Sequence, residues 1–121
     1  MIQLTAVLYR KPELTHEEFV DHWTTRHGPL MIETAGVAQY LRGYVQHVRT
    51  DDSVWSGPAG CDGVAQQWFD DLDAFQAMLA DPDYAQVIAP DEERFLDRSQ
   101  LRYAITSHTN VLIPPPAPEI R

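Results

Sequence analysis

The order in which strand-like and helix-like segments follow one another constrains this chain more than any other feature of its sequence. From Ile2 to Tyr9 the side chains alternate with a period of two, which is typical of a β-strand. Thr15 is followed three residues later by Glu18, and this capping box predicts a helix that begins at Thr15. We therefore expect the chain to open with a strand and a helix.

The predicted helix carries a stripe of side chains that should face the core. At about 100° per residue, these residues share one helix face: His16, Phe19, Val20, Trp23, His27 and Leu30. His22 lies off this stripe and is expected to point to water. The pair Gly28-Pro29 predicts a break or kink just after His27, and a short second turn that ends near Gly36. His27 should therefore face inward at the C-terminus of a helix.

Two further strands follow the first helix. Tyr40–Val48 is rich in β-forming and aromatic residues, and Gly63–Phe69 also fits a strand. Between them, residues 49–61 hold the Asp, Gly and Pro residues of a long loop, with Trp55 in its middle. The sequence therefore predicts two strands joined by a loop.

A second helical region should consist of short pieces. A helix capped by Asp70 or Asp71 should stop before Asp81-Pro82. Its expected buried stripe consists of Leu72, Phe75 and Leu79. A short helix should then start at Asp81-Pro82, and Pro90 should interrupt it before an acidic turn over residues 91–97.

The chain should end with a long strand over Leu101–Ile113 and a proline-rich arm over Pro114–Arg121. We expect one domain over residues 1–113 and a tail over residues 114–121. The order β-α-β-β-α-β is the α+β, ferredoxin-like arrangement, in which helices cover one face of a four-stranded antiparallel sheet. The other face would be bare and partly apolar, so we expect a second copy of the chain to cover it in a homodimer.

Length and charge narrow the class of partner. A chain of 121 residues is the size of one domain and leaves no room for a separate cofactor domain. The net charge of −9 disfavours nucleic acid and anionic membranes as partners and favours a small hydrophobic molecule. The sequence shows neither a signal-like N-terminus nor a membrane-length apolar run, so we expect a cytoplasmic protein. Cys61 is a single cysteine and is expected to be a bystander in a loop.

Familiar motifs for phosphate, dinucleotide or zinc binding are missing from the sequence, so we expect no cofactor and no metal. His16 and His27 share a helix face but are about 16 Å apart at 1.5 Å per residue, and therefore cannot hold one ion. The remaining options are acid–base chemistry by individual side chains, or simple binding.

Two residues are candidates for catalysis. An inward-facing His27 can change protonation near neutral pH, although the same pattern fits a structural histidine bonded to a carbonyl group. Tyr44, in the middle of a strand, can donate a hydrogen bond to a developing enolate or carbonyl oxygen. A core aromatic residue with its hydroxyl group at the rim would have the same pattern.

Other residues are candidates for substrate binding. His47 fits either a barrel mouth or a solvated strand end. Gln66 and Gln67 interrupt an apolar strand, and because neighbouring strand residues alternate between faces, one should point into each layer. Aromatic side chains expected in a pocket wall or in packing are Tyr9, Trp23, Trp55 and Trp68.

Short motifs in unchanged order resemble the EthD-domain family. They are Tyr9-Arg10-Lys11-Pro12, Thr15-His16-Glu17-Glu18-Phe19, His22-Trp23, His27-Gly28-Pro29, Tyr44-Val45-Gln46, Asp62-Gly63-Val64-Ala65 and Trp68-Phe69-Asp70. The resemblance covers about residues 2–113. It implies membership of the dimeric α+β barrel superfamily, which agrees with the dimer expected from the bare sheet face.

The resemblance also implies an active site between the helices and the sheet, with the family's histidine and tyrosine matched by His27 and Tyr44. Related proteins include muconolactone-type isomerases and fungal polyketide decarboxylases or dehydratases, which work without cofactors. The isomerases use a cysteine on the third strand, where this chain has Gln66-Gln67. We expect a cofactor-independent lyase or isomerase that acts on a small hydrophobic carbonyl or enol compound, such as an aromatic polyketide or a lactone. The alternatives are a cofactor-free or haem-dependent monooxygenase, and a non-catalytic accessory protein of an oxidative degradation system.

Overall fold

The computed structural model describes residues 1–50 and 60–118, so the expectation for Trp55 lies outside the described residues. The elements are, in chain order, β1 (Ile2–Leu8), α1 (His16–His22), η1 (Trp23–His27), α2 (Gly28–Glu33), α3 (Ala35–Ala38), β2 (Gly43–Val48), β3 (Gly63–Phe69), α5 (Leu72–Ala80), η2 (Tyr84–Ile88), α6 (Ala89–Phe95), η3 (Arg98–Gln100) and β4 (Arg102–Thr106). Segments η1 and η2 are π-helical, and η3 is a 3-10 turn.

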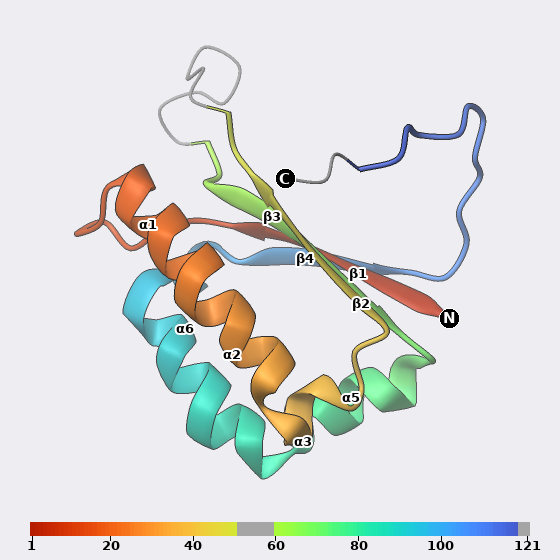
Figure 1. Cartoon of the computed structure of the whole chain (residues 1–121), viewed down its shortest axis with the longest axis horizontal. Helices are drawn as coiled ribbons and strands as arrows, with labels where there is room; N and C mark the ends of the chain where they lie inside the picture. The colour runs from red at the N-terminus through yellow and green to blue at the C-terminus, as the bar shows by residue number, and fades with distance from the viewer. Residues whose placement is uncertain (51–59, 119–121) are drawn as a thin grey trace.

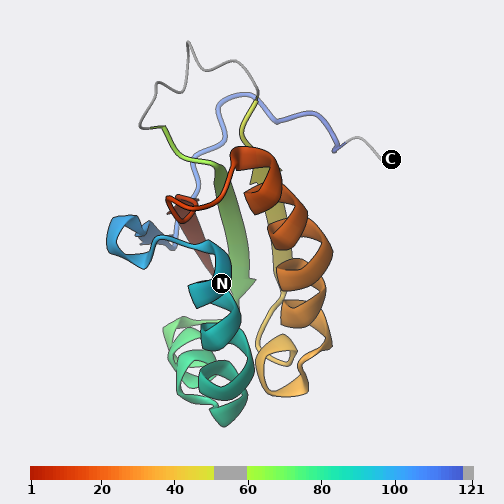
Figure 2. The same cartoon turned by 90° about the vertical axis from the view of Figure 1, so that its left-hand side faces the viewer.

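The four strands form one antiparallel sheet in the order β2-β3-β1-β4. All helices of the described residues lie on one face of this sheet (Figure 1), and a view turned by 90° shows the two helical runs side by side on that face (Figure 2). The predicted α+β, ferredoxin-like fold with a half-covered sheet is confirmed. After β4 the chain extends away from the helices (Figure 1).

Neither helical region is interrupted at its proline. A break after His27 and an interruption at Pro90 are therefore absent, whereas the predicted second turn that opens at Pro29 is present as α2. Segments α1, η1 and α2 follow one another without a gap, as do η2 and α6. Pro29 and Pro90 each lie in the first turn of the helix that follows a π-helical segment. A proline is tolerated there because its missing N–H needs no acceptor within the new helix. His27 therefore lies inside a continuous helical run and not at a helix C-terminus.

Two strands are shorter than predicted. Strand β2 begins at Gly43, because Tyr40 and Leu41 form turns in which their N–H groups donate to Val37 and Ala38. Strand β4 ends at Thr106, which pairs with Gln3 of β1. Strand β1 begins at Ile2, only one residue before Gln3. Among the described residues, those beyond Thr106 therefore have no neighbouring strand to pair with. Residues 107–118 are exposed and irregular.

The core lies between the sheet and the helices and forms two adjoining clusters. Phe69, Phe75 and Met78 belong to one cluster, and Phe19 and Trp23 to the other. Gly63 is required where Trp23 crosses β3, because a Cβ atom there would lie 2.5 Å from the indole ring.

Helix α5 is capped by Asp71 as expected, with a different buried stripe. Phe75 and Met78 are buried, whereas Leu72 and Leu79 are 48% and 43% exposed. The buried face of α5 is centred on Phe75 and Met78, which are three residues apart. Leu72 and Leu79 lie at the borders of this face.

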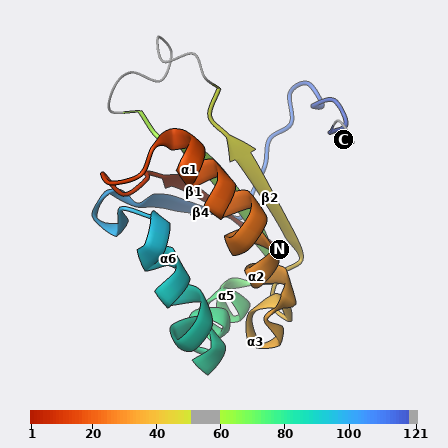
Figure 3. The same cartoon turned by 60° about the vertical axis from the view of Figure 1, so that its left-hand side comes forward.

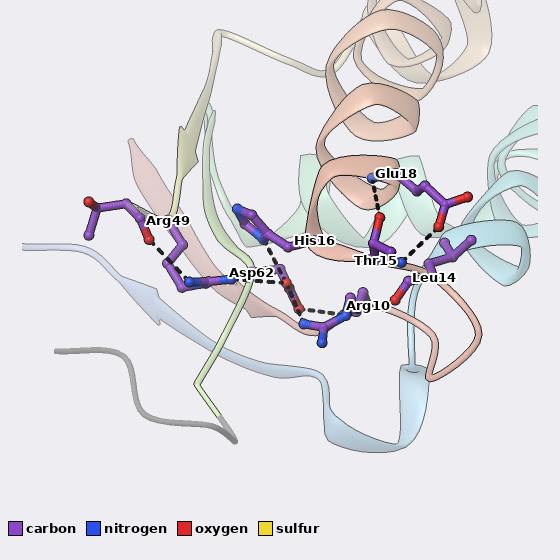
Figure 4. A network of polar contacts seen from close by, with 8 residues as sticks. Arg10, Leu14, Thr15, His16, Glu18, Arg49 and Asp62 are labelled. Atoms are coloured by element: carbon purple, nitrogen blue, oxygen red, sulfur yellow. Dashed lines mark hydrogen bonds and ion pairs between the residues drawn. The ribbon is translucent and has the colours of Figure 1, made fainter. Parts of the chain in front are cut away.

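The predicted capping box at the start of α1 is present. The Thr15 hydroxyl group accepts from the Glu18 backbone N–H, and the Glu18 carboxylate accepts from the Thr15 N–H. Close by, the buried carboxylate of Asp62 accepts from the Arg10 backbone and guanidinium and lies 2.7 Å from His16 Nδ1 (Figure 4). The sequence pattern placed His16 on the inward stripe of the helix. Its contact with Asp62 instead ties the start of α1 to the residue before β3.

Candidate active site

A cavity of about 210 Å³ lies between the sheet and the helices. Strands β1, β2, β3 and β4 provide one wall, and segments η1, α2, α5, η2 and α6 provide the other. Its apolar lining includes Leu4, Ala6, Leu8, Trp23, Met31, Ala65, Phe75, Met78, Phe95 and Leu96. Polar side chains at the wall are His27, Tyr44, Gln67, Tyr84, Glu92 and Tyr103. Figure 3 shows how α1 and α2 diverge from α6 over the sheet that closes this space.

His27 lines the cavity from η1 and is only 5% exposed. Its Nδ1 atom lies 2.9 Å from Asp91 Oδ2, and its Nε2 atom has no hydrogen-bond partner among the described residues. Burial lowers the pKa of His27 by more than Asp91 raises it. The ring is therefore neutral at pH 7, with its proton assigned to Nδ1 and a basic Nε2 available to a ligand.

Asp91 lies on α6 and is 3% exposed. Its second oxygen, Oδ1, lies 3.0 Å from His22 Nε2 and 3.2 Å from Arg94 Nη1. Burial would raise the pKa of Asp91, but the hydrogen bonds from His27 and His22 outweigh that effect and lower it. Asp91 is therefore an anion that holds His27 in one orientation.

The sequence-based interpretation missed Asp91 and misplaced His22. Asp91 shares the spacing of the buried residues Ile88 and Phe95, which marks it as an inward acidic residue rather than part of a solvated turn. His22 was expected to point to water but stacks on Phe95, with ring centroids 4.8 Å apart. Helix α1 packs against α6 as well as against the sheet. The buried part of its surface is therefore wider than the stripe that faces the strands, and it includes His22.

Tyr44 lines the cavity from β2, and its hydroxyl oxygen accepts a hydrogen bond from Gln46 Nε2 at 3.0 Å. The same amide nitrogen donates to the Trp23 carbonyl oxygen at 3.0 Å. Gly28 makes room for this amide, because a Cβ atom there would lie 2.9 Å from Gln46 Nε2. Burial raises the pKa of Tyr44, so its hydroxyl group keeps a proton that it can donate into the cavity.

A second polar group lies on the cavity wall. The Tyr84 hydroxyl group donates to both carboxylate oxygens of Glu92, each at 3.1 Å. Burial raises the pKa of Glu92, although the hydrogen bond from Tyr84 and the charge of Arg98 partly counteract this. No periodic pattern in the sequence points to this pair beyond the acidic character of residues 91–97.

Gln67 is a further polar residue of the wall, and its Oε1 atom is buried without a hydrogen-bond partner among the described residues. Gln66 points to the opposite face of the sheet, where its Oε1 atom lies 2.8 Å from His47 Nε2. The expected alternation of the two glutamines between the layers is confirmed.

The other candidates for substrate binding are divided between the two sides of the sheet. Trp23 lines the cavity. His47, Gln66 and Trp68 lie on the uncovered face, with Trp68 packed over Gly43. Tyr9 follows β1 and is not part of the cavity wall; its carbonyl oxygen accepts from the Asp97 N–H.

Residues 1–50 and 60–118 contain no group of three or more His, Cys, Asp or Glu side chains placed to hold a metal ion. Within the same ranges, every helix is too short or too polar to span a lipid bilayer.

Known proteins resemble this chain in sequence. It is 29% identical over 106 residues to the dehydratase aurZ of Gibberella zeae, an alignment that covers 80% of this chain and 70% of the relative. It is 26% identical over 112 residues to the dehydratase ustZ of Ustilaginoidea virens, with 84% of this chain and 80% of the relative covered.

Solved structures share the fold. An ethyl tert-butyl ether D (EthD) family protein from Bacillus halodurans superposes with a TM-score of 0.65 at 22% identity, over 90% of this chain and 99% of the other. A dimeric ferredoxin-like protein of unknown function from Thermobifida fusca superposes with a TM-score of 0.61 at 14% identity, over 88% and 90% of the two chains.

The family assignment rests on the match between the EthD domain model and residues 11–99. This range begins after β1 and ends within η3, so it includes the helices that carry His27 and Asp91. The chain belongs to the EthD domain family.

Proposed function

We propose that this protein is a cofactor-independent lyase of the dehydratase type that acts on a small hydrophobic carbonyl or enol compound. The observation that carries the proposal is the position of His27, whose Nε2 atom is free within a largely apolar cavity while Asp91 holds Nδ1. The similarity to two fungal dehydratases supports the choice of reaction class.

His27 acts as a general base in this proposal. Its neutral imidazole takes a proton from the carbon next to a carbonyl group through Nε2, and the carboxylate of Asp91 stabilises the imidazolium that forms. Tyr44 donates its hydroxyl proton in a hydrogen bond to the carbonyl oxygen as negative charge develops there. The reaction needs both groups on one substrate, and both line the same cavity.

The cavity also suggests the size and polarity of the substrate. Its walls are mostly leucine, methionine and aromatic side chains, which favour an apolar body, and its polar groups are few and convergent. A volume of about 210 Å³ suits a compound with one or two rings.

A kinetic comparison of two histidine variants tests this function. The probe is the aldol adduct of benzaldehyde and acetone, whose dehydration gives a conjugated enone that absorbs ultraviolet light. His27→Gln should lower turnover by about 10²- to 10⁴-fold, the usual contribution of a positioned acid or base. His108→Gln, the same change at an exposed position after β4, should leave turnover unchanged.

Three results would contradict the proposal. They are full activity in His27→Gln, an equal loss in both variants, and oxygen consumption with a quinol in place of dehydration. The last result would indicate the monooxygenase alternative.

We also propose that the protein forms a homodimer through the uncovered sheet face. Side chains on that face include Val7, Val45, Val64 and Trp68, and Val45 is 39% exposed in the single chain. The similar protein from Thermobifida fusca is described as dimeric, which supports this assembly. Light scattering during size-exclusion chromatography should give about twice the 13.8 kDa of one chain, and a mass near 13.8 kDa would overturn the dimer.

A further inference from the structure

The proposed function assigns a base to the cavity but no group that helps the hydroxide leave. Hydroxide is a poor leaving group, and its departure at neutral pH needs a proton from a general acid. The cavity wall contains one further acid–base candidate beside His27 and the tyrosines, and that is Glu92.

The surroundings of Glu92 favour the protonated form of its carboxyl group. Glu92 lines the cavity, and Tyr84 on η2 donates to both of its carboxylate oxygens, which restrains the group. The charged and titratable groups that act on it are Tyr84, Arg98 on η3, Asp91 on its own helix and Tyr44 on β2. Burial raises the pKa of Glu92 whereas burial lowers that of His27, so the two groups move toward the forms needed for one acid and one base.

Gln67 supplies a second, independent observation in the same cavity. Its Oε1 atom is buried and accepts no hydrogen bond among the described residues. Buried acceptors are almost always paired, so an unpaired one on a cavity wall points to a donor on the ligand. A substrate hydroxyl group can donate to Gln67 and still accept a proton on its oxygen from another group.

We propose that Glu92 is the general acid that protonates the departing hydroxyl group, and that Gln67 binds this hydroxyl group through its amide oxygen. The substrate class is then a β-hydroxy carbonyl compound, with the carbonyl oxygen at Tyr44 and the hydroxyl group at Gln67 and Glu92. This assignment rests on the proposed dehydratase function. It adds the residues that bind and protonate the departing hydroxyl group.

The reaction balances without an oxidant or a reductant. His27 Nε2 removes the proton from the carbon between the two functional groups, and the electron pair of that C–H bond forms the new C=C bond. The C–O bond breaks, and the oxygen takes the Glu92 proton and leaves as water. The enzyme then holds an imidazolium and a carboxylate, and net transfer of one proton from His27 to Glu92 through water restores both groups.

A change of leaving group separates the acid from the base. The probes are the aldol adduct of benzaldehyde and acetone and the same ketone with chloride in place of the hydroxyl group. Chloride leaves without a proton, so it needs His27 but not Glu92. Glu92→Gln should lower elimination of water by about 10²-fold or more and elimination of chloride far less. His27→Gln should lower both.

The matched control is Glu93→Gln, which makes the same change at the next position. Glu93 is exposed, and its carboxylate lies 3.3 Å from Arg98 Nη1. This variant should eliminate water at the wild-type rate. Circular dichroism of the three variants should match the wild-type spectrum, because each substitution keeps a side chain of similar size or polarity.

The pH profile gives a readout that a structural role for Glu92 would not change. With the hydroxyl probe, kcat/KM of the wild type should fall toward high pH as Glu92 ionises. With the chloride probe this fall should be absent, because only the base is needed. Gln67→Met should raise KM for the hydroxyl probe and leave KM for the chloride probe nearly unchanged.

The outcomes distinguish this inference from the function on which it rests. Full water elimination in Glu92→Gln, or equal losses with both leaving groups, would overturn the role of Glu92. Proton exchange in heavy water at the carbon next to the carbonyl depends on His27 alone. If the wild type catalysed no such exchange with either probe, the proposed function itself would fail, and the assignment of Glu92 with it.

Discussion

His27 Nδ1 lies 2.9 Å from Asp91 Oδ2, although the two residues are 64 positions apart in the sequence. The contact joins the first helical run to the second beside the cavity that His27 lines, and both partners are buried. A buried carboxylate that accepts from Nδ1 fixes the tautomer of the ring and leaves Nε2 as the reactive nitrogen.

Replacing Asp91 should impair catalysis more than folding. Asp91→Asn keeps the shape of the side chain but removes the charge that stabilises an imidazolium, so kcat/KM should fall by about 10²- to 10⁴-fold. Asp91 raises the pKa of His27 against the effect of burial, and its loss should lower that pKa further.

The pH dependence of kcat/KM checks the sign of this effect. In the wild type, burial places the acid limb of the profile below the ordinary histidine pKa of about 6.5. In Asp91→Asn the limb should move to still lower pH. The exposed Asp73→Asn serves as a control with an unchanged profile, and a limb that moved to higher pH would contradict the assigned contact.

The Tyr44 hydroxyl group should contribute to the rate and little to stability. Tyr44→Phe removes one donor to the developing oxygen charge, and the loss of such a donor typically lowers kcat by about 10²- to 10³-fold. Gln46 keeps its hydrogen bond to the Trp23 carbonyl oxygen in the variant, so the wall of the cavity should remain in place.

Steady-state kinetics and thermal unfolding of Tyr44→Phe should be measured beside Tyr40→Phe. Tyr40 packs against the core without lining the cavity, and its variant should retain the wild-type kcat. Equal losses of activity in the two variants would show that the effect of Tyr44 is structural.

Asp62 should make the free energy of unfolding depend on pH in the acidic range. Burial alone would raise the pKa of Asp62, but the hydrogen bonds from the Arg10 backbone, His16 and the Arg10 guanidinium outweigh it and lower the pKa. A carboxylate with a lowered pKa in the folded state stabilises that state at pH values above its unfolded pKa of about 3.9. This contribution is lost as the pH falls from there through the folded-state value.

Urea unfolding over a range of pH values tests this prediction. The free energy of unfolding of the wild type should fall below about pH 4, and that of Asp62→Asn should fall less steeply. At neutral pH the variant should be about 1–3 kcal/mol less stable. Asp70→Asn removes an exposed partner of Arg42 and should cost at most about 1 kcal/mol. Parallel pH curves for wild type and Asp62→Asn would contradict the predicted linkage.

The sequence by itself determined the class of fold and most of its local structure. The period of two from Ile2 to Tyr9, the capping box at Thr15 and the inward stripe with Phe19, Trp23 and His27 are local patterns, and each is present in the structure. They are readable because hydrogen bonds and burial within one strand or helix depend on residues a few positions apart.

Local rules failed where a neighbouring element decides the outcome. Proline at position 29 or 90 suggests an interruption, but each helical run accommodates it after a π-helical segment. Residues 107–113 have the composition of a strand, but β1 begins at Ile2 and offers them no partner. Strand length depends on the neighbouring strand as much as on the segment itself.

The candidate site shows the same division between local and tertiary information. His27 and Tyr44 could be selected from the sequence, because one faces inward on a helix and the other lies in the middle of a strand. Gln67 was also a candidate, but only the structure shows that it faces the cavity with an unpaired oxygen. Asp91 and Glu92 were not selected, because their roles depend on the buried side chains that they contact. Residue type and spacing along the chain name possible acids and bases. Only tertiary packing decides which of them are buried together. Their shared burial then determines their pKa values and the groups that they can contact.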